Sequence, residues 1–396
     1  MQILTFLQHG LLNFSHTQII ITLLIATQIT ILAVTLYLHR DQTHKGLQLH
    51  PVIRHFFRLH LWLTTGMLTK DWVAIHRKHH AKCETEEDPH SPKIYGINKV
   101  LFSGVELYTK ERHKQETLDK YGRGTPDDWL ERNIYTRFHF LGIIIMLLID
   151  VAAFGVIGIT FWAIQIVWIP FFAAGVINGL GHWSGYRNYS TKDCSTNLTR
   201  FGFIIGGEEL HNNHHAFPSS CKFSHKKGEF DLGWMTIRLL NLIKLAKIHK
   251  TVPELQQSAN ASVDLEAVKA MLTHKVNLLQ VYIKDVVKPA ISQEYKLRSK
   301  QLRKTRKQFL KSMSLDWQFL DEDSKQLFKQ YMQTSPSIAT ILKYRDELKE
   351  IWECKGQTTE QMIEAIKQWC LKAEQSGVEV LQNYAKKLQT YRLKLT

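Results

Sequence analysis

Two long stretches without charge constrain the fold of this 396-residue chain more than any other feature. Residues Thr17–Leu38 carry no charged side chain over 22 positions, and Phe140–Leu180 carry only Asp150 over 41. About 20 apolar residues are enough for a helix to cross the hydrocarbon core of a bilayer, so the first stretch predicts one membrane span and the second predicts two. We expect these spans at about 17–38, 139–157 and 159–180.

Basic residues indicate how the spans are oriented. The first 16 residues contain no Lys or Arg, and neither does the expected turn near Gly155, whereas 39–137 and 182–396 are rich in both. Because cytoplasmic loops carry an excess of Lys and Arg, we expect both long segments in the cytoplasm and the N-terminus outside. Residues 1–14 are too short to cross at about 1.5 Å per residue, and we expect them to lie at the membrane interface.

The segment at about 50–69 is apolar but interrupted by Arg54 and Arg58, which are four residues apart and share one face of a helix. Phe56 and Leu59 fall on another face. This pattern predicts an interfacial helix that lies among the lipid headgroups rather than crossing the bilayer. Together with the three spans it predicts an all-α fold, a membrane-anchored helical bundle with a cytoplasmic helical cap.

We expect residues 1–250 to form this membrane domain and residues 251–396, where Gln, Lys, Glu and Leu dominate, to form a basic helical cytoplasmic tail. The densest basic run of the tail is 296–311. The positive-inside bias and attraction to anionic lipids account for the formal net charge of +15, so we expect membrane lipids and no nucleic acid as partners. The five cysteines form no CxxC pair, and we expect reduced thiols.

Nine histidines fall into four clusters just outside the apolar stretches, which places all of them on the cytoplasmic side. Neutral imidazole is a ready ligand for iron, copper, zinc and nickel. One zinc ion takes about four ligands, so nine imidazoles are too many for one ion and predict a pair of ions with five or six ligands each. The expected metal ligands are His39, His44, His76, His79, His80, His182, His211, His214 and His215.

Two of the clusters share the pattern HxxHH, at 76–80 and at 211–215. Residues three and four apart stack on one face of a helix, so each pattern can aim three imidazoles in one direction. His39 and His44 are five apart, which on a regular helix separates them by roughly 140°. Each could serve a different ion, or the helix could unwind between them.

Other polar residues near the clusters could support a metal site. Asn178 lies four residues before His182 and could hold a metal-bound water. Ligating imidazoles usually donate their second nitrogen to a carboxylate or carbonyl, and several carboxylates are near in sequence. No HExxH is present, which argues against a zinc peptidase, and no carboxylate pair with ExxH spacing is present, which argues against a soluble di-iron carboxylate bundle. The carboxylates are Asp41, Glu84, Asp88, Glu208 and Glu209.

These residues resemble those of the membrane fatty acyl desaturases. The resemblance spans about residues 30–235 and looks most like the bacterial delta-9 branch, which includes enzymes thought to act on acyl chains of membrane phospholipids. Typical members have one more span before the first histidine motif, so the expected N-terminal topology departs from the family. The motifs are HRDQTH at 39–44, HRKHH at 76–80 followed by ETEEDPH at 84–90, Asn178 with His182, and GGEELHNNHHAFP at 206–218.

The resemblance implies a non-haem centre of two iron ions, with the nine histidines as ligands and Asn178 linked through water. It implies that O2 removes two hydrogens from a saturated long acyl chain and leaves a cis double bond, with electrons from an external ferredoxin, rubredoxin, cytochrome or flavin reductase. The substrate would be a phospholipid or an acyl thioester, in the inner membrane of a bacterium, with the active site on the cytoplasmic side. Candidate tunnel residues are Trp72, Trp168 and Ile177.

Two other functions stay open at this point. A histidine-box hydroxylase or ketolase acting on lipids or alkanes would use the same ligands and differ in product. A membrane metal transporter or sensor belongs to a different class of protein. Transport needs polar ligands within the spans, whereas these histidines lie beyond the ends of the spans.

Overall fold

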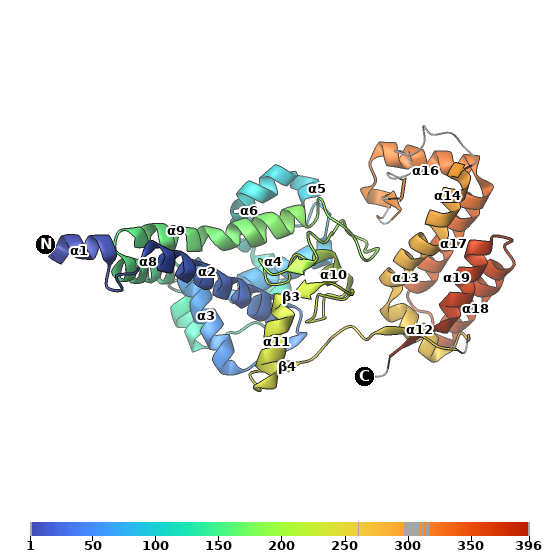
Figure 1. The fold of residues 1–396 in the computed structure, drawn as a ribbon. Coiled ribbons are helices and arrows are strands. Elements are labelled where there is room, and N and C mark those ends of the chain that lie inside the picture. The colour runs from blue at the N-terminus through green and yellow to red at the C-terminus, as the bar shows by residue number, and fades with distance from the viewer. Residues whose placement is uncertain are drawn as a thin grey trace. The chain divides into compact units, whose positions relative to one another are not determined.

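The computed structural model describes residues 2–259, 261–296, 309–310, 312–313, 315 and 317–394. The chain divides into two compact units. The first consists of Met1–Tyr186 with Ser195–Val252, and the second of Arg187–Cys194 with Pro253–Thr396. The junction at 252 lies two residues from the expected boundary, and the short segment 187–194 groups with the second unit. Figure 1 shows the helices of each unit.

Two helices of the first unit are long and apolar enough to cross a membrane. The first joins α2 (His16–Leu32) to the π-helix η1 (Ala33–Thr43), and the second joins α9 (Ile157–Ile169) to the π-helix η3 (Pro170–Leu180). They contain 28 and 24 residues and match two of the expected spans. The fold is helical, as predicted, and these two helices have the length and apolar composition of membrane spans.

The third expected span corresponds to α8 (Leu141–Phe154), which has 14 residues and is about 21 Å long, shorter than the hydrocarbon core of about 30 Å, so it does not reach the length of a full span. It begins two residues later than expected, after a turn at 136–140. Gly155 has φ 71°, a left-handed conformation that costs glycine little, and it ends α8 just before α9 begins. In Figure 1, α8 and α9 run side by side as the predicted hairpin.

The predicted interfacial helix is α3 (Pro51–Thr65). It ends four residues earlier than expected because Gly66 takes the left-handed conformation, with φ 64°. Its side chains Val52, Phe56 and Leu59 are exposed and lie on one face, as a helix at a lipid surface requires.

The remaining elements of the first unit lie at the ends of the long helices and include the two that carry the HxxHH patterns. These two are α4 (Thr69–Lys82) and α10 (His211–Ala216). Strand β1 (Leu47–Leu49) pairs antiparallel with β4 (Ala246–Ile248), and β2 (Phe201–Gly202) pairs parallel with β3 (Phe230–Asp231). The other helices are α1 (Gln2–His9), α5 (Pro92–Tyr95), α6 (Ile97–Arg112), α7 (Gln115–Tyr121), η2 (Glu131–Tyr135) and α11 (Leu232–Leu242).

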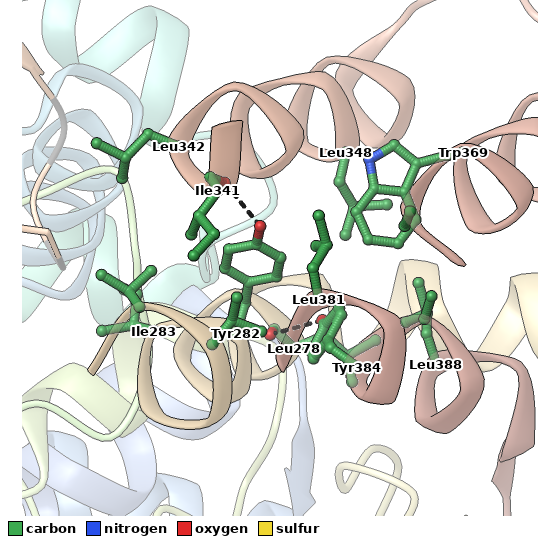
Figure 2. Close-up of a cluster of buried hydrophobic side chains, with 14 of the residues drawn as sticks. Leu278, Tyr282, Ile283, Ile341, Leu342, Leu348, Trp369, Leu381, Tyr384 and Leu388 are labelled. Atoms are coloured by element: carbon green, nitrogen blue, oxygen red, sulfur yellow. Dashed lines mark hydrogen bonds between the residues drawn. The ribbon is translucent and has the colours of Figure 1, made fainter. Parts of the chain in front are cut away.

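The described part of the second unit is helical around its own hydrophobic core, apart from strand β5 (Leu255–Gln257), which pairs antiparallel with β6 (Tyr391–Leu393). Figure 2 shows this core, in which the Tyr282 hydroxyl donates to the Ile341 carbonyl at 2.6 Å. Most of the predicted basic run at 296–311 lies outside the described residues. The helices are α12 (Leu265–Thr273), α13 (Lys275–Tyr282), η4 (Ile283–Val287), α14 (Lys288–Lys296), η6 (Trp317–Phe319), α16 (Glu322–Thr334), α17 (Pro336–Glu353), α18 (Thr359–Glu374) and α19 (Glu379–Thr390).

A buried ion pair joins the end of η1 to the segment before α11. The Arg40 guanidinium donates to Asp231 Oδ1 at 2.9 Å and to Oδ2 at 3.2 Å, and both side chains are fully buried. Arg40 also donates to the carbonyls of Gly206 and Cys221. Gly207, with φ 100°, passes so close that a Cβ there would lie 2.2 Å from Asp231 Oδ1. Only glycine fits at this position.

We predict that Asp231→Asn lowers the thermal unfolding midpoint of the detergent-purified protein. The change leaves the Arg40 charge buried without its carboxylate, which typically costs about 3–5 kcal/mol. The matched control is Glu106→Gln, which removes the partner of Lys99 in an exposed ion pair and should leave the midpoint unchanged. Equal midpoints for the two variants would contradict this account of the ion pair.

Candidate metal centre

The nine expected ligands lie together in the first unit as two adjacent clusters of imidazole rings. Cluster A contains five histidines and cluster B contains four. The rings of His79 in B and His80 in A have centroids 5.6 Å apart, so the two clusters are neighbours. Cluster A is His39, His44, His76, His80 and His214, and cluster B is His79, His182, His211 and His215.

In cluster A the Nε2 atoms of the rings face one another. Nε2 of His214 lies 3.0 Å from Nε2 of His39 and 2.9 Å from Nε2 of His80. Nε2 of His76 lies 3.1 Å from that of His80 and 3.2 Å from that of His44. Five nitrogens from three separate helices therefore surround one small volume.

Cluster B has the same organisation. Nε2 of His182 lies 3.2 Å from Nε2 of His79 and 2.9 Å from Nε2 of His211. The ring of His215 completes the group, with centroids 4.5 Å from His211 and 4.7 Å from His182. His182 stands alone in the sequence, and in the fold it lies beside histidines of both HxxHH helices.

Carboxylates hold the second nitrogen of three of these rings. Nδ1 of His39 donates to Glu208 Oε1 at 2.8 Å, and Nδ1 of His79 donates to Asp88 Oδ1 at 2.9 Å. Nδ1 of His182 donates to Glu84 Oε1 at 2.8 Å. An ionised carboxylate only accepts hydrogen bonds, so each ring carries its proton on Nδ1 and a lone pair on Nε2.

The ionised form is favoured for two of these carboxylates, Asp88 and Glu208. Burial raises the pKa of Asp88 and Glu208, but the neighbouring imidazoles and hydrogen bonds outweigh burial and hold both pKa values below their ordinary range. Three of the imidazoles are kept neutral, because burial first, and repulsion from neighbouring histidines second, lowers the pKa of His76, His80 and His214 well below the usual value. Neutral imidazole is the form that binds metal.

The spacing of the nitrogens fits metal ions. His79 and His182 both carry their proton on Nδ1, so their Nε2 lone pairs face each other at 3.2 Å and repel unless a cation lies between them. At a metal–nitrogen distance of about 2.1 Å, neighbouring ligands of an octahedral ion lie about 3 Å apart. The measured separations of 2.9–3.2 Å agree with that value. Each cluster therefore fits one metal ion.

The π-helix η1 explains how His39 and His44 reach one cluster. A π-helix closes hydrogen bonds between residues five apart, so such residues lie one above the other. The amide of His44 donates to the carbonyl of His39 at 3.1 Å, and the two ring centroids are 5.0 Å apart. The separation of roughly 140° that a regular helix would impose is absent, because the helix is wider here.

The two HxxHH patterns are helical, as predicted, in α4 and α10. The fully buried side chain of Asn213 holds the short helix α10 in place. Asn213 Oδ1 accepts from Asn197 Nδ2 at 2.9 Å, and its own Nδ2 donates to Glu229 and to the carbonyl of Phe223. Asn213 thus attaches α10 to the loops before and after it.

Two of the five carboxylates considered from the sequence serve other partners. Asp41 accepts two hydrogen bonds from the Arg54 guanidinium, at 2.6 and 2.7 Å. Glu209 accepts from the backbone amides of Ile205 and Gly207. They shape the loops around the site and do not touch the ligand rings through these bonds.

A largely apolar cavity of about 490 Å³ opens beside both clusters. Its walls include ligand rings of both clusters, namely His39, His76 and His211, together with Asn178. Of the candidate tunnel residues, Trp72 and Ile177 line this cavity. Trp168 is not among the lining residues, and its ring packs against Phe172 with centroids 4.7 Å apart.

His90 lines the cavity but was not among the residues predicted to take part in the site. It is 7% exposed, it lines the cavity, and its ring stacks on the ligand His79 with centroids 4.4 Å apart. Its backbone amide donates to Asp88, the carboxylate that orients His79. Its position two residues after Asp88 was the feature of the sequence that could have indicated a place near the site.

Comparison with known families agrees with this site. The family model described as fatty acid desaturase matches residues 15–227, more than half of the chain. This range contains every histidine of both clusters and the three carboxylates. A second family model, described as a transposase, matches residues 272–396, less than a third of the chain, and contains none of the metal centre.

Several curated relatives carry desaturase names. The sn-1 stearoyl-lipid 9-desaturase of Anabaena variabilis is 31% identical over 238 residues, which cover 59% of this chain and 84% of the relative. Delta-9 acyl-lipid desaturase 1 of Arabidopsis thaliana is 29% identical over 260 residues, covering 63% and 81%. Icosanoyl-CoA 5-desaturase of Limnanthes douglasii is 32% identical over 240 residues, covering 57% and 63%. With two imidazole clusters beside an apolar cavity, the chain belongs to the fatty acid desaturase family.

Proposed function

We propose that this protein inserts a cis double bond at position 9 of a saturated long acyl chain, using O2 and a di-iron centre. The observation that carries the proposal is the pair of imidazole clusters, each spaced for one cation, that open into the same apolar cavity. A hydrocarbon chain in this cavity would lie against both clusters. The names of the relatives supply position 9 and the acyl-lipid substrate.

The donor set favours iron. The reaction transfers electrons to O2, and zinc has no redox chemistry, so a redox-active metal is needed. Imidazole ligands suit iron, and the fatty acid desaturase family implies it. Cluster A would hold one iron and cluster B the other, with Asn178 near enough to the cavity to bind a water there. When bound, the two irons would activate O2 for removal of the substrate hydrogens.

The residues of the chain bind and orient around that chemistry. Glu84, Asp88 and Glu208 hold Nδ1–H of three ligand rings, so that each Nε2 keeps its lone pair directed into its cluster. The cavity walls exclude water and hold the acyl chain by shape. The overall change is balanced: O2, two hydrogens of the substrate, two electrons and two protons give the alkene and two water molecules.

The same proposal specifies the substrate, the electron donor and the location of the protein. The substrate would be an acyl chain of a phospholipid or of an acyl thioester. The electrons would come from an external ferredoxin, rubredoxin, cytochrome or flavin reductase. By the positive-inside bias, the metal centre would face the cytoplasm of a bacterium from its inner membrane, among membrane lipids. No role in these steps is proposed for the unit after residue 253.

We predict that the purified protein holds about two iron ions per chain and that cells expressing it gain a monounsaturated fatty acid. Removing the metal with a chelator should abolish desaturation, and His214→Ala should reduce both iron content and product. The matched control is His249→Ala, an exposed histidine whose ring contacts Gln48 and lies outside both clusters. An alcohol as the main product, or unaltered activity after complete metal removal, would contradict the proposal.

We predict different effects for the adjacent variants Glu208→Gln and Glu209→Gln. Glu208→Gln weakens the acceptor of His39 Nδ1–H, and losing such a partner typically costs roughly 10- to 100-fold in metal affinity or activity. In Glu209→Gln the amide oxygen can still accept from one of the two backbone amides, and neither of these bonds touches a histidine of the clusters, so metal affinity should be preserved. Competition between the protein and a chelator measures both affinities. Equal affinities in the two variants would show that the carboxylate of Glu208 does not support the ligand.

We predict that Ile177→Trp lowers turnover of long acyl chains and shifts the product toward shorter ones, because the larger side chain fills part of the cavity. Metal content should stay at the wild-type value, since Ile177 is not a ligand. Trp168→Phe, from outside the cavity lining, serves as the control and should leave the chain-length profile unchanged. Lipid analysis by gas chromatography measures the profile. A shift caused by Trp168→Phe alone would place the substrate elsewhere.

A further inference from the structure

A cysteine lies at the edge of cluster B. Cys83 directly follows the last residue of α4 and is four residues after His79, so the two side chains lie on the same side of the chain. Its Sγ lies 3.8 Å from His79 Nε2, which faces cluster B, and 3.8 Å from His182 Nδ1, which faces Glu84. One potential ligand atom from each of His79, Cys83, His182 and His215 lies within 4.8 Å of the others.

The position of Cys83 is fixed by its neighbours. The next residue, Glu84, has the left-handed φ of 64°, which is uncommon for a residue with a side chain. Its amide donates to Asp88 Oδ2 at 2.8 Å, and its carboxylate accepts from His182. Because Glu84 and Asp88 both orient ligands of cluster B, the turn that sets their place also sets the place of the thiol.

The donor count and the geometry point to a role for this sulfur. Cluster A offers five imidazoles, whereas cluster B offers four. With distances of about 2.3 Å from metal to sulfur and about 2.1 Å from metal to nitrogen, a separation of 3.8 Å gives an angle of about 120° at a shared ion. We propose that Cys83, as a thiolate, is the fifth protein ligand of the metal ion in cluster B.

This inference rests on the proposed metal centre and adds a ligand to it. On binding, the thiol releases its proton to solvent and the sulfur forms a bond to the metal, with no change of oxidation state. The thiolate brings a negative charge to one ion only, while cluster A stays all-imidazole. The two metal ions are then chemically different.

The test uses the full-length protein, stripped of metal by a chelator and loaded with Co²⁺ alone. Thiolate bound to Co²⁺ gives a charge-transfer absorption band in the near ultraviolet that imidazole ligands do not give. We expect this band in the wild type and in the control Cys354→Ser, whose cysteine is exposed in the second unit. We expect Cys83→Ser to lose the band while about two cobalt ions per chain remain bound.

A second measurement avoids the variant altogether. Cys83 is partly exposed, so iodoacetamide should label it in the metal-free wild type, and cobalt should reduce that labelling several-fold. Labelling of Cys354 should not change. Mass spectrometry of the peptides quantifies both sites.

The outcomes separate this inference from the proposed function. Two cobalt ions without the band, or a band that survives Cys83→Ser, would overturn the inference and leave the two-metal proposal standing. Labelling of Cys83 that cobalt does not reduce would also overturn it. A wild-type protein that fails to bind two metal ions would instead overturn the proposed function.

Discussion

The site depends on where each buried imidazole ring carries its proton. His79 and His182 both carry their proton on Nδ1, so their Nε2 lone pairs face each other at 3.2 Å, which is unfavourable without a cation between them. The carboxylates that accept from Nδ1 fix both the tautomer and the ring plane. Since these carboxylates are themselves buried, each is held together with the ring it orients.

The frame around the centre depends on segments far apart in the chain. Cluster A takes its rings from η1, α4 and α10, and the Arg40–Asp231 pair joins the first of these to the segment before α11. Arg40 directly follows His39 in the chain. The glycines at 206 and 207 let the backbone pass beside Arg40 and bring Glu208 to His39. Fold stability and ligand orientation therefore share the same residues.

Much of this site follows from sequence patterns because the patterns are local. The HxxHH spacing predicts rings on one helix face, and apolar length predicts which helices lie in a bilayer. The width of η1 was not predictable, because a π-helix depends on contacts made far along the chain and the spacing of His39 and His44 suggests a different angle. Which of the five carboxylates contact a histidine of the clusters was likewise not predictable. Glu208 and Glu209 are adjacent in the sequence, and only tertiary contacts determine which of them reaches His39.

The apolar character of the cavity decides how a substrate can be held. A saturated chain offers no charge or hydrogen bond near the carbons that react, so recognition must come from the shape of the walls and from where the cavity closes. Trp72 lies one turn before His76 on α4, and both line the cavity, so a change in the tryptophan alters the wall within one helical turn of a ligand. A substitution at Trp72 would therefore act on the cavity wall and on the nearby histidine together, whereas one at Ile177, on η3, would act on the wall alone.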